Sequence, residues 1–255
     1  MTDTDAGPDA ADVVESTVLD GRVRLLQPAR GYRAGMDAAL LAAAVASDDG
    51  RRLFEAGCGA GAAMLQVAAR RPDVSMVGLE RDPAAAALAR ANVEANGAAD
   101  RVEVIEGDVA AGFAALDQAL FDHAFSNPPF FDDESSLRGP APARRGAWIA
   151  DDGLSAWIAL LTLSVRSRGR ITLIHRADRL GDILGLLAPR AGSVAIRPIQ
   201  PHADQPSKRV LVRAVRDGRA PLRLLPPLVL HDRSGAKHTP EAEAILRGRS
   251  DLGFE

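Results

Sequence analysis

Short apolar segments that alternate with alanine-rich helical segments constrain the fold of this chain most. From Met36 onward, segments typical of strands and of helices follow one another with few exceptions. Strands joined by helices run parallel in one sheet, with helices on both faces. The sequence therefore predicts an α/β fold with a doubly wound, mostly parallel sheet.

The residues that flank these segments indicate where they begin and end. Asp20-Gly21 is a hairpin signal between strands at Thr17–Leu19 and Arg22–Leu26. Asp82-Pro83 is typical of a helix start, and Gly97 of a helix end. Further strands are expected at Arg52–Glu55, Ser75–Leu79, Arg101–Ile105, Phe121–Ser126, Arg170–Ile174, Ser193–Ile199 and Arg209–Val215, and helices at Met36–Ala46, Ala62–Arg71, Val109–Gln118, Leu154–Val165 and Leu180–Leu187. The last two strands are joined without a helix, so we expect them to pair antiparallel.

We expect a single domain over residues 17–255, which includes the N-terminal hairpin and a C-terminal extension. Residues 1–16 are acidic and rich in small side chains, which predicts a disordered tail. In the extension, the sequence predicts an extended segment and then a short helix at Pro240–Arg247. The connection Phe131–Ala150 has no periodicity, and loops of this length in compact domains are usually functional or mobile.

Composition excludes several classes of protein. The longest apolar runs, such as Ala38–Ala46, are interrupted by charges well before membrane-spanning length, so we expect no membrane span. Cys58 is the only cysteine, which excludes an internal disulfide and, without a secretory signal, predicts a cytoplasmic protein. The net charge of −3 is not that of a polycation made for nucleic acid. The histidines lack the spacing of a metal site.

Asn127-Pro128-Pro129-Phe130 is the most specific motif, at the end of the expected strand Phe121–Ser126. Prolines lack backbone N–H groups and cannot continue a central strand, so the chain turns there. The Asn127 amide oxygen and the Pro128 carbonyl can then accept both hydrogens of a planar NH2 group, while the Phe130 ring stacks on the ring that carries it. The alternative is a strand-ending turn with a core phenylalanine.

A glycine-rich loop, Gly57-Cys58-Gly59-Ala60-Gly61, follows the first expected strand of the sheet. Ligands of a doubly wound sheet bind beyond the carboxyl ends of the strands, where glycines let the backbone approach them. The spacing differs from the G-x-G-x-x-G of dinucleotide sites. Glu80 ends the next strand, where an acid can accept from ribose hydroxyls. Asp108 follows the third, where it can accept from an adenine amine or cap a helix.

In this order, the motifs resemble those of the class I S-adenosylmethionine-dependent methyltransferases. Three further matches narrow the resemblance to the bacterial tRNA (adenine-N6) methyltransferases: Gly31 to Asp37, Pro198 to Val212 and Leu230 to Glu241. The resemblance spans about residues 17–248. That family often has tyrosine where this chain has Phe130, and both rings stack.

The resemblance implies S-adenosylmethionine as cofactor, no metal, and a site of three parts. Catalytic residues would be Asn127, Pro128, Pro129 and Phe130. Cofactor-binding residues would be Arg33, Asp37, Glu55, Gly57, Gly59, Gly61, Glu80, Arg81, Asp108 and Asn127. Substrate-binding residues would be Phe130, Phe131, Arg144, Arg145, Lys208 and Arg209. The implied acceptor is the N6 amine of an adenine in RNA, above all in tRNA.

Other acceptors share the Asn-Pro-Pro-Phe motif. Protein-glutamine methyltransferases resemble this chain from the glycine loop to Phe130 but carry a helical N-terminal domain, whereas only a hairpin and one helix precede the loop here. Guanine-N2 rRNA methyltransferases typically duplicate the domain, and DNA adenine methylation usually needs a target-recognition domain. A small-molecule acceptor, a non-catalytic cofactor-binding RNA-binding protein and a homodimer are left open.

Overall fold

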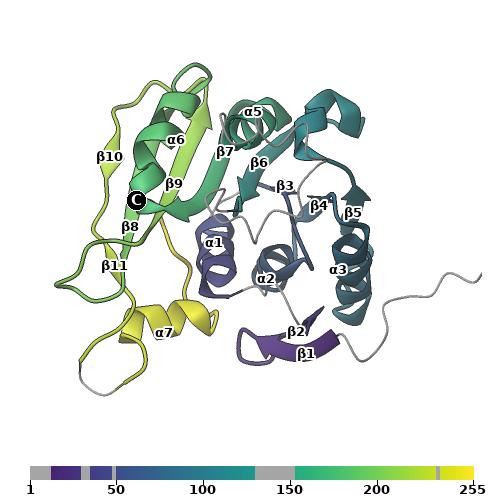
Figure 1. Ribbon diagram of the computed structural model, residues 1–255, viewed down its shortest axis with the longest axis horizontal. Coiled ribbons are helices and arrows are strands. Elements are labelled where there is room, and N and C mark those ends of the chain that lie inside the picture. Colours follow the sequence, from purple (N-terminus) through teal and green to yellow (C-terminus); the bar gives the residue numbers. More distant parts are fainter. Residues whose placement is uncertain (1–12, 30–34, 48–49, 130–152, 234–235) are drawn as a thin grey trace, which may run out of the picture.

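In the part of the chain that the structure describes, nine strands form a mixed β-sheet at the centre (Figure 1). This computed structural model describes residues 13–29, 35–47, 50–129, 153–233 and 236–255. No helix in this part of the chain is long and apolar enough to cross a lipid bilayer.

The elements include short 3-10 helices, which are labelled η. Along the chain they are β1 (Val13–Val18), β2 (Val23–Pro28), α1 (Met36–Ala46), β3 (Arg52–Ala56), α2 (Ala62–Arg70), β4 (Ser75–Glu80), α3 (Pro83–Ala95), β5 (Val102–Glu106), η2 (Val109–Ala111), η3 (Phe113–Leu116), β6 (Phe121–Ser126), α5 (Leu154–Ser164), β7 (Val165–Arg176), η4 (Ala177–Arg179), α6 (Leu180–Leu187), β8 (Ala191–Gln200), β9 (Arg209–Arg216), β10 (Arg223–Leu224), β11 (Leu228–Val229) and α7 (Pro240–Leu246).

The strand order places a switch point between β3 and β6. In the described residues the order is β10-β8-β9-β7-β6-β3-β4-β5, and β11 also pairs with β8. The chain steps from β3 through β4 to β5, then returns to pair β6 with the other side of β3. Strands β3 to β7 are parallel, and β9 lies antiparallel between β7 and β8. The expected doubly wound, mostly parallel sheet is confirmed, and so is the antiparallel pairing of the strands predicted at Ser193–Ile199 and Arg209–Val215, which are β8 and β9.

Two apolar cores cover the two faces of the sheet, because successive side chains of a strand point to opposite faces. One core contains α1 and α2, with Leu41 and Met64, and includes Ile174 of β7. The other contains α5 and α6, with Leu161, and includes Leu173 of β7. The hairpin β1–β2 lies next to α2 and α3, on the side of the first core (Figure 1). The central strands are therefore buried on both faces.

The N-terminal hairpin is longer than the sequence predicts. β1 begins at Val13, so the predicted disordered tail over residues 1–16 is wrong from Val13 onward, and the residues before Val13 lie outside the described part. Val18 pairs with Val23, which leaves Leu19–Arg22 as the loop instead of a two-residue turn. The β-branched side chains of β1 favour the longer pairing. Leu19 is buried, which anchors this loop to the core.

The helix predicted over Val109–Gln118 is wrong. The structure has η2 and η3 there, separated by Gly112. Gly112 has φ 76° and ψ 170°, and Asp117 has φ 48°, and neither conformation continues a helix. The strand predicted at Arg170–Ile174 is also too short, because β7 begins directly where α5 ends.

Candidate active site

Three strand ends meet at one edge of the sheet. In the parallel pairing, Ala56 of β3 lies opposite Leu79 of β4 and opposite Ser126 of β6. The hydroxyl of Ser126 donates to the carbonyl oxygen of Ala56 at 2.8 Å. The glycine loop directly follows β3, Glu80 is the last residue of β4, and Asn127 directly follows β6. The structure therefore brings these three parts of the predicted site to the switch point, where ligands of such sheets bind.

The glycine loop adopts a backbone conformation that other residues rarely have. The φ angles of Gly57, Gly59 and Gly61 are 67°, 54° and 83°. A Cβ atom on Gly57 would also lie 2.3 Å from Cη2 of Trp157 on α5. The N–H of Gly61 donates to the carbonyl oxygen of Cys58 at 2.8 Å, which closes the turn before α2. The shape of this turn, together with the neighbouring indole, requires glycine.

Glu55 is a buried carboxyl group just before the loop. Glu55 is 3% exposed, and its Oε2 atom has no hydrogen-bond partner. Burial raises the pKa of Glu55 well above its usual value, a backbone hydrogen bond from Met64 opposes this, and the charge of Glu80 adds to it. Two neighbouring acids, one of them with an orphaned oxygen, favour a ligand that carries positive charge.

Glu80 connects the glycine loop with the start of α3. Its Oε2 atom accepts from the N–H of Gly59 at 2.9 Å. Its Oε1 atom accepts from the N–H groups of Arg81 and Asp82, both at 2.9 Å. Glu80 is half-buried, whereas Arg81 is exposed. The carboxylate of Glu80 is thereby held at the end of β4, against the loop.

Asp108 lies two residues beyond Glu106, the last residue of β5, which pairs with Glu80. Its Oδ1 atom accepts from the N–H of Ala110 at 2.9 Å, so it caps η2. The N–H of Gly107 donates to the carbonyl oxygen of Glu80 at 2.9 Å, which keeps the loop after β5 close to the end of β4. Asp108 is exposed, and its capping role is compatible with a further contact to a ligand.

Asn127, Pro128 and Pro129 follow β6 immediately, where the missing proline N–H groups end the strand. Asn127 is half-buried and Pro128 is buried. Because β6 pairs with β3 on one side and β7 on the other, this segment leaves the middle of the sheet. Its prolines offer carbonyl acceptors and no backbone donors.

Asp37 and Arg209, predicted in different parts of the site, form an ion pair with each other. The Nε atom of Arg209 lies 3.0 Å from Oδ2 of Asp37, which joins the first turn of α1 to the start of β9. Lys208 is exposed beside this pair. Arg33, Phe130, Phe131, Arg144 and Arg145 lie outside the described residues. The roles of all these residues stay predictions.

Cys58 does not add a reactive group to this site. Burial raises the pKa of the Cys58 thiol well above its usual value, and the charges of Glu55 and Glu80 raise it further, so the thiolate is disfavoured. Within the described ranges, no three histidine, cysteine, aspartate or glutamate side chains are arranged to hold a metal ion.

Two residues that contact the glycine loop are not marked by the motifs. Trp157 packs on Gly57, and nothing in its local sequence indicates this contact. Asn92 of α3 donates to the carbonyl oxygen of Ala60 at 2.9 Å. A signal for Asn92 exists, because it is a polar residue on the apolar, buried face of a helix, and buried polar groups are hydrogen-bonded.

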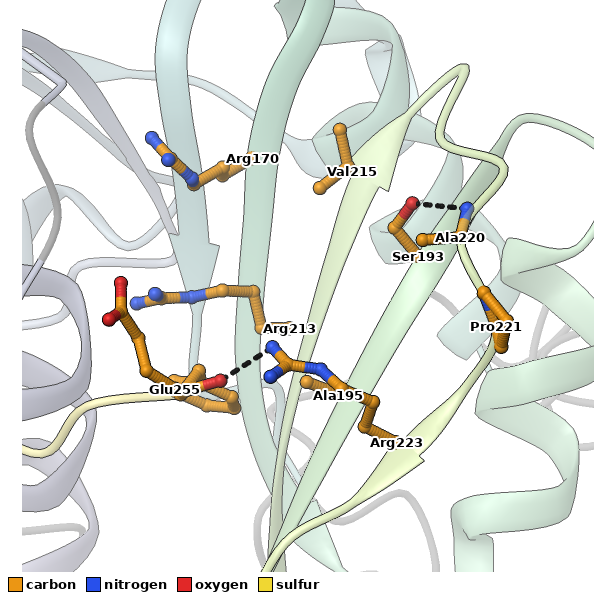
Figure 2. Close-up of a pocket in the computed structure, with 10 residues that line it drawn as sticks. Arg170, Ser193, Ala195, Arg213, Val215, Ala220, Pro221, Arg223 and Glu255 are labelled. Carbon is orange, nitrogen blue, oxygen red and sulfur yellow. Dashed lines mark hydrogen bonds between the residues drawn. The ribbon is translucent and has the colours of Figure 1, made fainter.

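The cavity in Figure 2 lies away from these strand ends. It has a volume of about 500 Å³, and its lining includes Arg170, Arg213 and Arg223. Arg170 pairs with Val215 in the first half of β7, far from its carboxyl end. The Arg213 guanidinium lies 4.2 Å from the centre of the Phe254 ring, and Arg223 donates to the Phe254 carbonyl at 2.6 Å. These contacts attach the C-terminal segment to the sheet.

Comparisons with known proteins match methyltransferases. A family model described as "Methyltransferase small domain" matches residues 33–138. A protein of Porphyromonas gingivalis (strain ATCC 33277), named tRNA1(Val) (adenine(37)-N6)-methyltransferase, is 34% identical over 164 residues, which are 59% of this chain and 61% of that protein. The match therefore spans less than two thirds of that relative. A protein of the same name from Shewanella amazonensis is 29% identical over 197 residues, 76% of this chain and 77% of the relative.

A solved structure matches over nearly its whole length. It is a crystal structure from Agrobacterium tumefaciens, described as that of a predicted O-methyltransferase. It is 30% identical, with a TM-score of 0.72, and the match covers 85% of this chain and 98% of that one. The chain belongs to the class I S-adenosylmethionine-dependent methyltransferases, and S-adenosylmethionine is its cofactor.

Proposed function

We propose that this protein transfers the methyl group of S-adenosylmethionine to the N6 amine of an adenine in tRNA. The observation that carries the proposal is the position of Asn127 and Pro128, which leave β6 beside the glycine loop at the switch point of the sheet. The names of the relatives from P. gingivalis and S. amazonensis support the same acceptor, adenine 37 of a valine tRNA.

The residues at the strand ends fit the cofactor by charge and by shape. When bound, S-adenosylmethionine supplies a methyl group on a positively charged sulfur. In our proposal the glycine loop receives its methionine part, and Glu55 accepts from its ammonium group through the oxygen that has no partner. Glu80 accepts from the ribose hydroxyls, as an acid at this position does in related sheets. Asp108 accepts from the adenine amine of the cofactor.

Asn127 and Pro128 would orient the acceptor amine. The lone pair of an adenine amine is conjugated with the ring, so the amine is a poor nucleophile. The Asn127 amide oxygen and the Pro128 carbonyl oxygen accept from its two N–H groups and hold the nitrogen in line with the methyl group. They also stabilise the positive charge on nitrogen as the N–C bond forms and the C–S bond breaks. The methylated nitrogen is acidic and releases its proton without a strong base.

The same geometry argues against an oxygen acceptor, which the description of the A. tumefaciens structure would suggest. A hydroxyl group has one hydrogen to donate and would use only one of the two acceptors. It would also need a base to remove its proton, and in our proposal the carboxylate of Glu55 is engaged by the ammonium group of the cofactor. A planar NH2 group engages both acceptors and needs no base.

The test of the proposal is methyl transfer to unmodified tRNA. The protein is incubated with labelled S-adenosylmethionine and tRNA transcripts, and the RNA is digested to nucleosides for mass spectrometry. We expect N6-methyladenosine as the product. Asn127→Ala should lower kcat about 100-fold or more, as loss of one oriented transition-state contact does, with the affinity for S-adenosylhomocysteine unchanged. Asn96→Ala, an asparagine at the end of α3, is the control and should keep full activity.

Other methylated products would refute the assignment of adenine as the acceptor. N2-methylguanosine from ribosomal RNA, methylglutamine from protein substrates, a methylated ribose hydroxyl or a methylated small molecule would each replace adenine as the acceptor. Cofactor binding without transfer to any of these substrates would indicate a non-catalytic protein. Full activity of Asn127→Ala would refute the role of the amide.

A further inference from the structure

Two asparagines, Asn92 in α3 and Asn96 at its C-cap, take the place of a third strand beside the N-terminal hairpin. In the described residues, β2 pairs with β1 on one edge only. On its other edge, the side chain of Asn96 accepts from the N–H of Arg24 at 2.9 Å and donates to the carbonyl oxygen of Arg24 at 2.7 Å. Asn92 makes the same two bonds with Leu26, at 2.7 and 2.8 Å.

The spacing of the two amides fits the strand. Residues four apart on a helix are separated by about 6 Å along its axis, and residues two apart on a strand by about 6.7 Å. Asn92 and Asn96 can therefore each face one residue of β2 whose backbone points away from β1. The hairpin is docked on α3 by paired hydrogen bonds as well as by apolar contacts.

Each amide also donates to one further backbone carbonyl, and only that of Asn92 reaches the glycine loop. Asn96 donates to the carbonyl oxygen of Asn92 at 2.7 Å, whereas Asn92 donates to the carbonyl oxygen of Ala60, in the loop, at 2.9 Å. The peptide group between Ala60 and Gly61 is held at its other side too, because the N–H of Gly61 donates to Cys58 at 2.8 Å. Asn92 is 0% exposed, so solvent does not compete for these bonds. One buried amide therefore joins the hairpin to the point where the loop enters α2.

We infer that Asn92 is a positioning residue for the cofactor. The amide of Asn92 couples the docking of the N-terminal hairpin to the conformation of the glycine loop. The inference rests on the proposed cofactor site at this loop and is independent of the acceptor. Such a coupling is reciprocal: if the docked hairpin favours cofactor binding, bound cofactor favours the docked hairpin by the same factor.

Asn92→Ala and Asn96→Ala form a matched pair, because both remove the bonds to one residue of β2 but only the first releases Ala60. We expect Asn92→Ala to raise the Kd for S-adenosylhomocysteine and the KM for S-adenosylmethionine about tenfold, within the ordinary range of coupling between sites. Its kcat at saturating cofactor should be unchanged, and Asn96→Ala should change neither constant. An equal shift in both variants, or none in either, would refute the coupling.

Hydrogen exchange of the unmodified protein tests the reciprocal effect without a substitution, and so covers the case in which Asn92→Ala does not fold. Saturating S-adenosylhomocysteine should slow the exchange of the amides of Arg24 and Leu26 several-fold. The amide of Leu225, which donates to Ile196 at 2.8 Å on the far side of the sheet, is the reference and should not change. Unchanged exchange in the hairpin would also refute the coupling.

A third variant separates this inference from the cofactor site on which it rests. Gly59→Ala strains the loop directly, because Gly59 has φ 54°. If Gly59→Ala binds S-adenosylhomocysteine as well as the unmodified protein does, the glycine loop is not the cofactor site and both assignments fall. If Gly59→Ala loses binding while Asn92→Ala keeps it, the cofactor site stands and the role of Asn92 falls.

Discussion

The stability of the protein without ligand and the binding of a cationic ligand favour opposite protonation states of Glu55. Its apolar surroundings raise its pKa in the folded state above the ordinary value of 4.5. A carboxyl group with a raised folded pKa contributes stability that is fully present below the unfolded pKa and is lost as the pH rises through the folded pKa. A cationic ligand reverses this preference, because it stabilises the ionised carboxylate.

Replacing Glu55 should therefore separate stability from binding. Without ligand, we expect Glu55→Gln to be more stable than the unmodified protein, by a margin that grows as the pH rises above 4.5. We expect it to bind S-adenosylmethionine at least about tenfold more weakly, or ~1.4 kcal/mol. Binding to the unmodified protein should release protons, which calorimetry in buffers of different ionisation enthalpy measures. Equal affinity of the two proteins would show that Glu55 does not contact the ligand.

At the residue scale, the sequence predicts groups that follow strands better than groups that act from helices. Glu80 and Asn127 could be placed because the first ends an apolar strand and the second directly follows one, and parallel strands end at one edge of the sheet. Asn92 and Trp157 reach the loop from helices, and their contacts depend on how α3 and α5 pack. Packing angles between elements are not encoded in local spacing. The ion pair between Asp37 and Arg209 could not be predicted for the same reason, because it joins two elements, α1 and β9.

At the scale of elements, the contact between the glycine loop and α5 fixes the loop at Gly57, whereas Glu80 holds it at Gly59. Trp157 lies in the first turns of α5, and its indole touches Gly57 closely enough to exclude any Cβ atom. Gly59 has the same left-handed backbone, but nothing lies within 4 Å of a Cβ placed on it. A side chain at either position would therefore strain the backbone, but only one at Gly57 would also collide with a neighbouring residue.

Gly57→Ala and Gly59→Ala should differ accordingly. We expect Gly59→Ala to lower the free energy of unfolding by about 1–2 kcal/mol, the cost of a left-handed alanine. Gly57→Ala should cost more, because the indole must also move, and it should shift the fluorescence emission of Trp157 in a background where Trp148 is replaced by phenylalanine. Denaturant unfolding and emission spectra measure both effects. Equal destabilisation of the two variants, with no change in the emission spectrum, would show that the Trp157 indole does not resist a side chain at Gly57.

Most elements could be predicted from capping and periodicity, and the exceptions have physical causes. Asp82 caps α3 through the N–H groups of Ala84 and Ala85, as the Asp-Pro pair predicts. The helix predicted at Val109–Gln118 fails because Gly112 interrupts an otherwise helical composition. The start of β1 at Val13 depends on its pairing with β2. The sequence of Val13–Ser16 alone does not show whether such a partner strand is present.

At the scale of the whole molecule, two buried histidines make folding depend on pH. Burial lowers the pKa of His123 well below its usual value, and the charges of Arg213 and Arg170 lower it further. Burial, followed by the charge of Arg179, lowers the pKa of His175 to about 4. Both rings are neutral inside the folded sheet, whereas in the unfolded chain they take up protons below the ordinary value of 6.5.

The free energy of unfolding should fall as the medium becomes acidic. A lowered histidine pKa contributes stability that is present above the unfolded pKa, near 6.5, and is lost as the pH falls toward the folded pKa. We expect a slope of up to about 1.4 kcal/mol per pH unit for each histidine. His175→Gln should have a shallower slope in urea unfolding between pH 6.5 and 4.5. Glu55 contributes equally in both proteins, so equal slopes would mean that His175 is protonated in the folded state.

The far edge of the sheet also has a consequence for behaviour in concentrated solution. The outer side of β8 is covered by β10 and β11, each two residues long, with Pro226 and Pro227 between them. Leu222 and Leu224 are exposed beside this edge, at 51% and 68%. A continuous apolar edge strand would template the addition of a strand from another molecule, and two residues without N–H groups interrupt that template. We therefore expect the prolines to hinder edge-to-edge association of this chain.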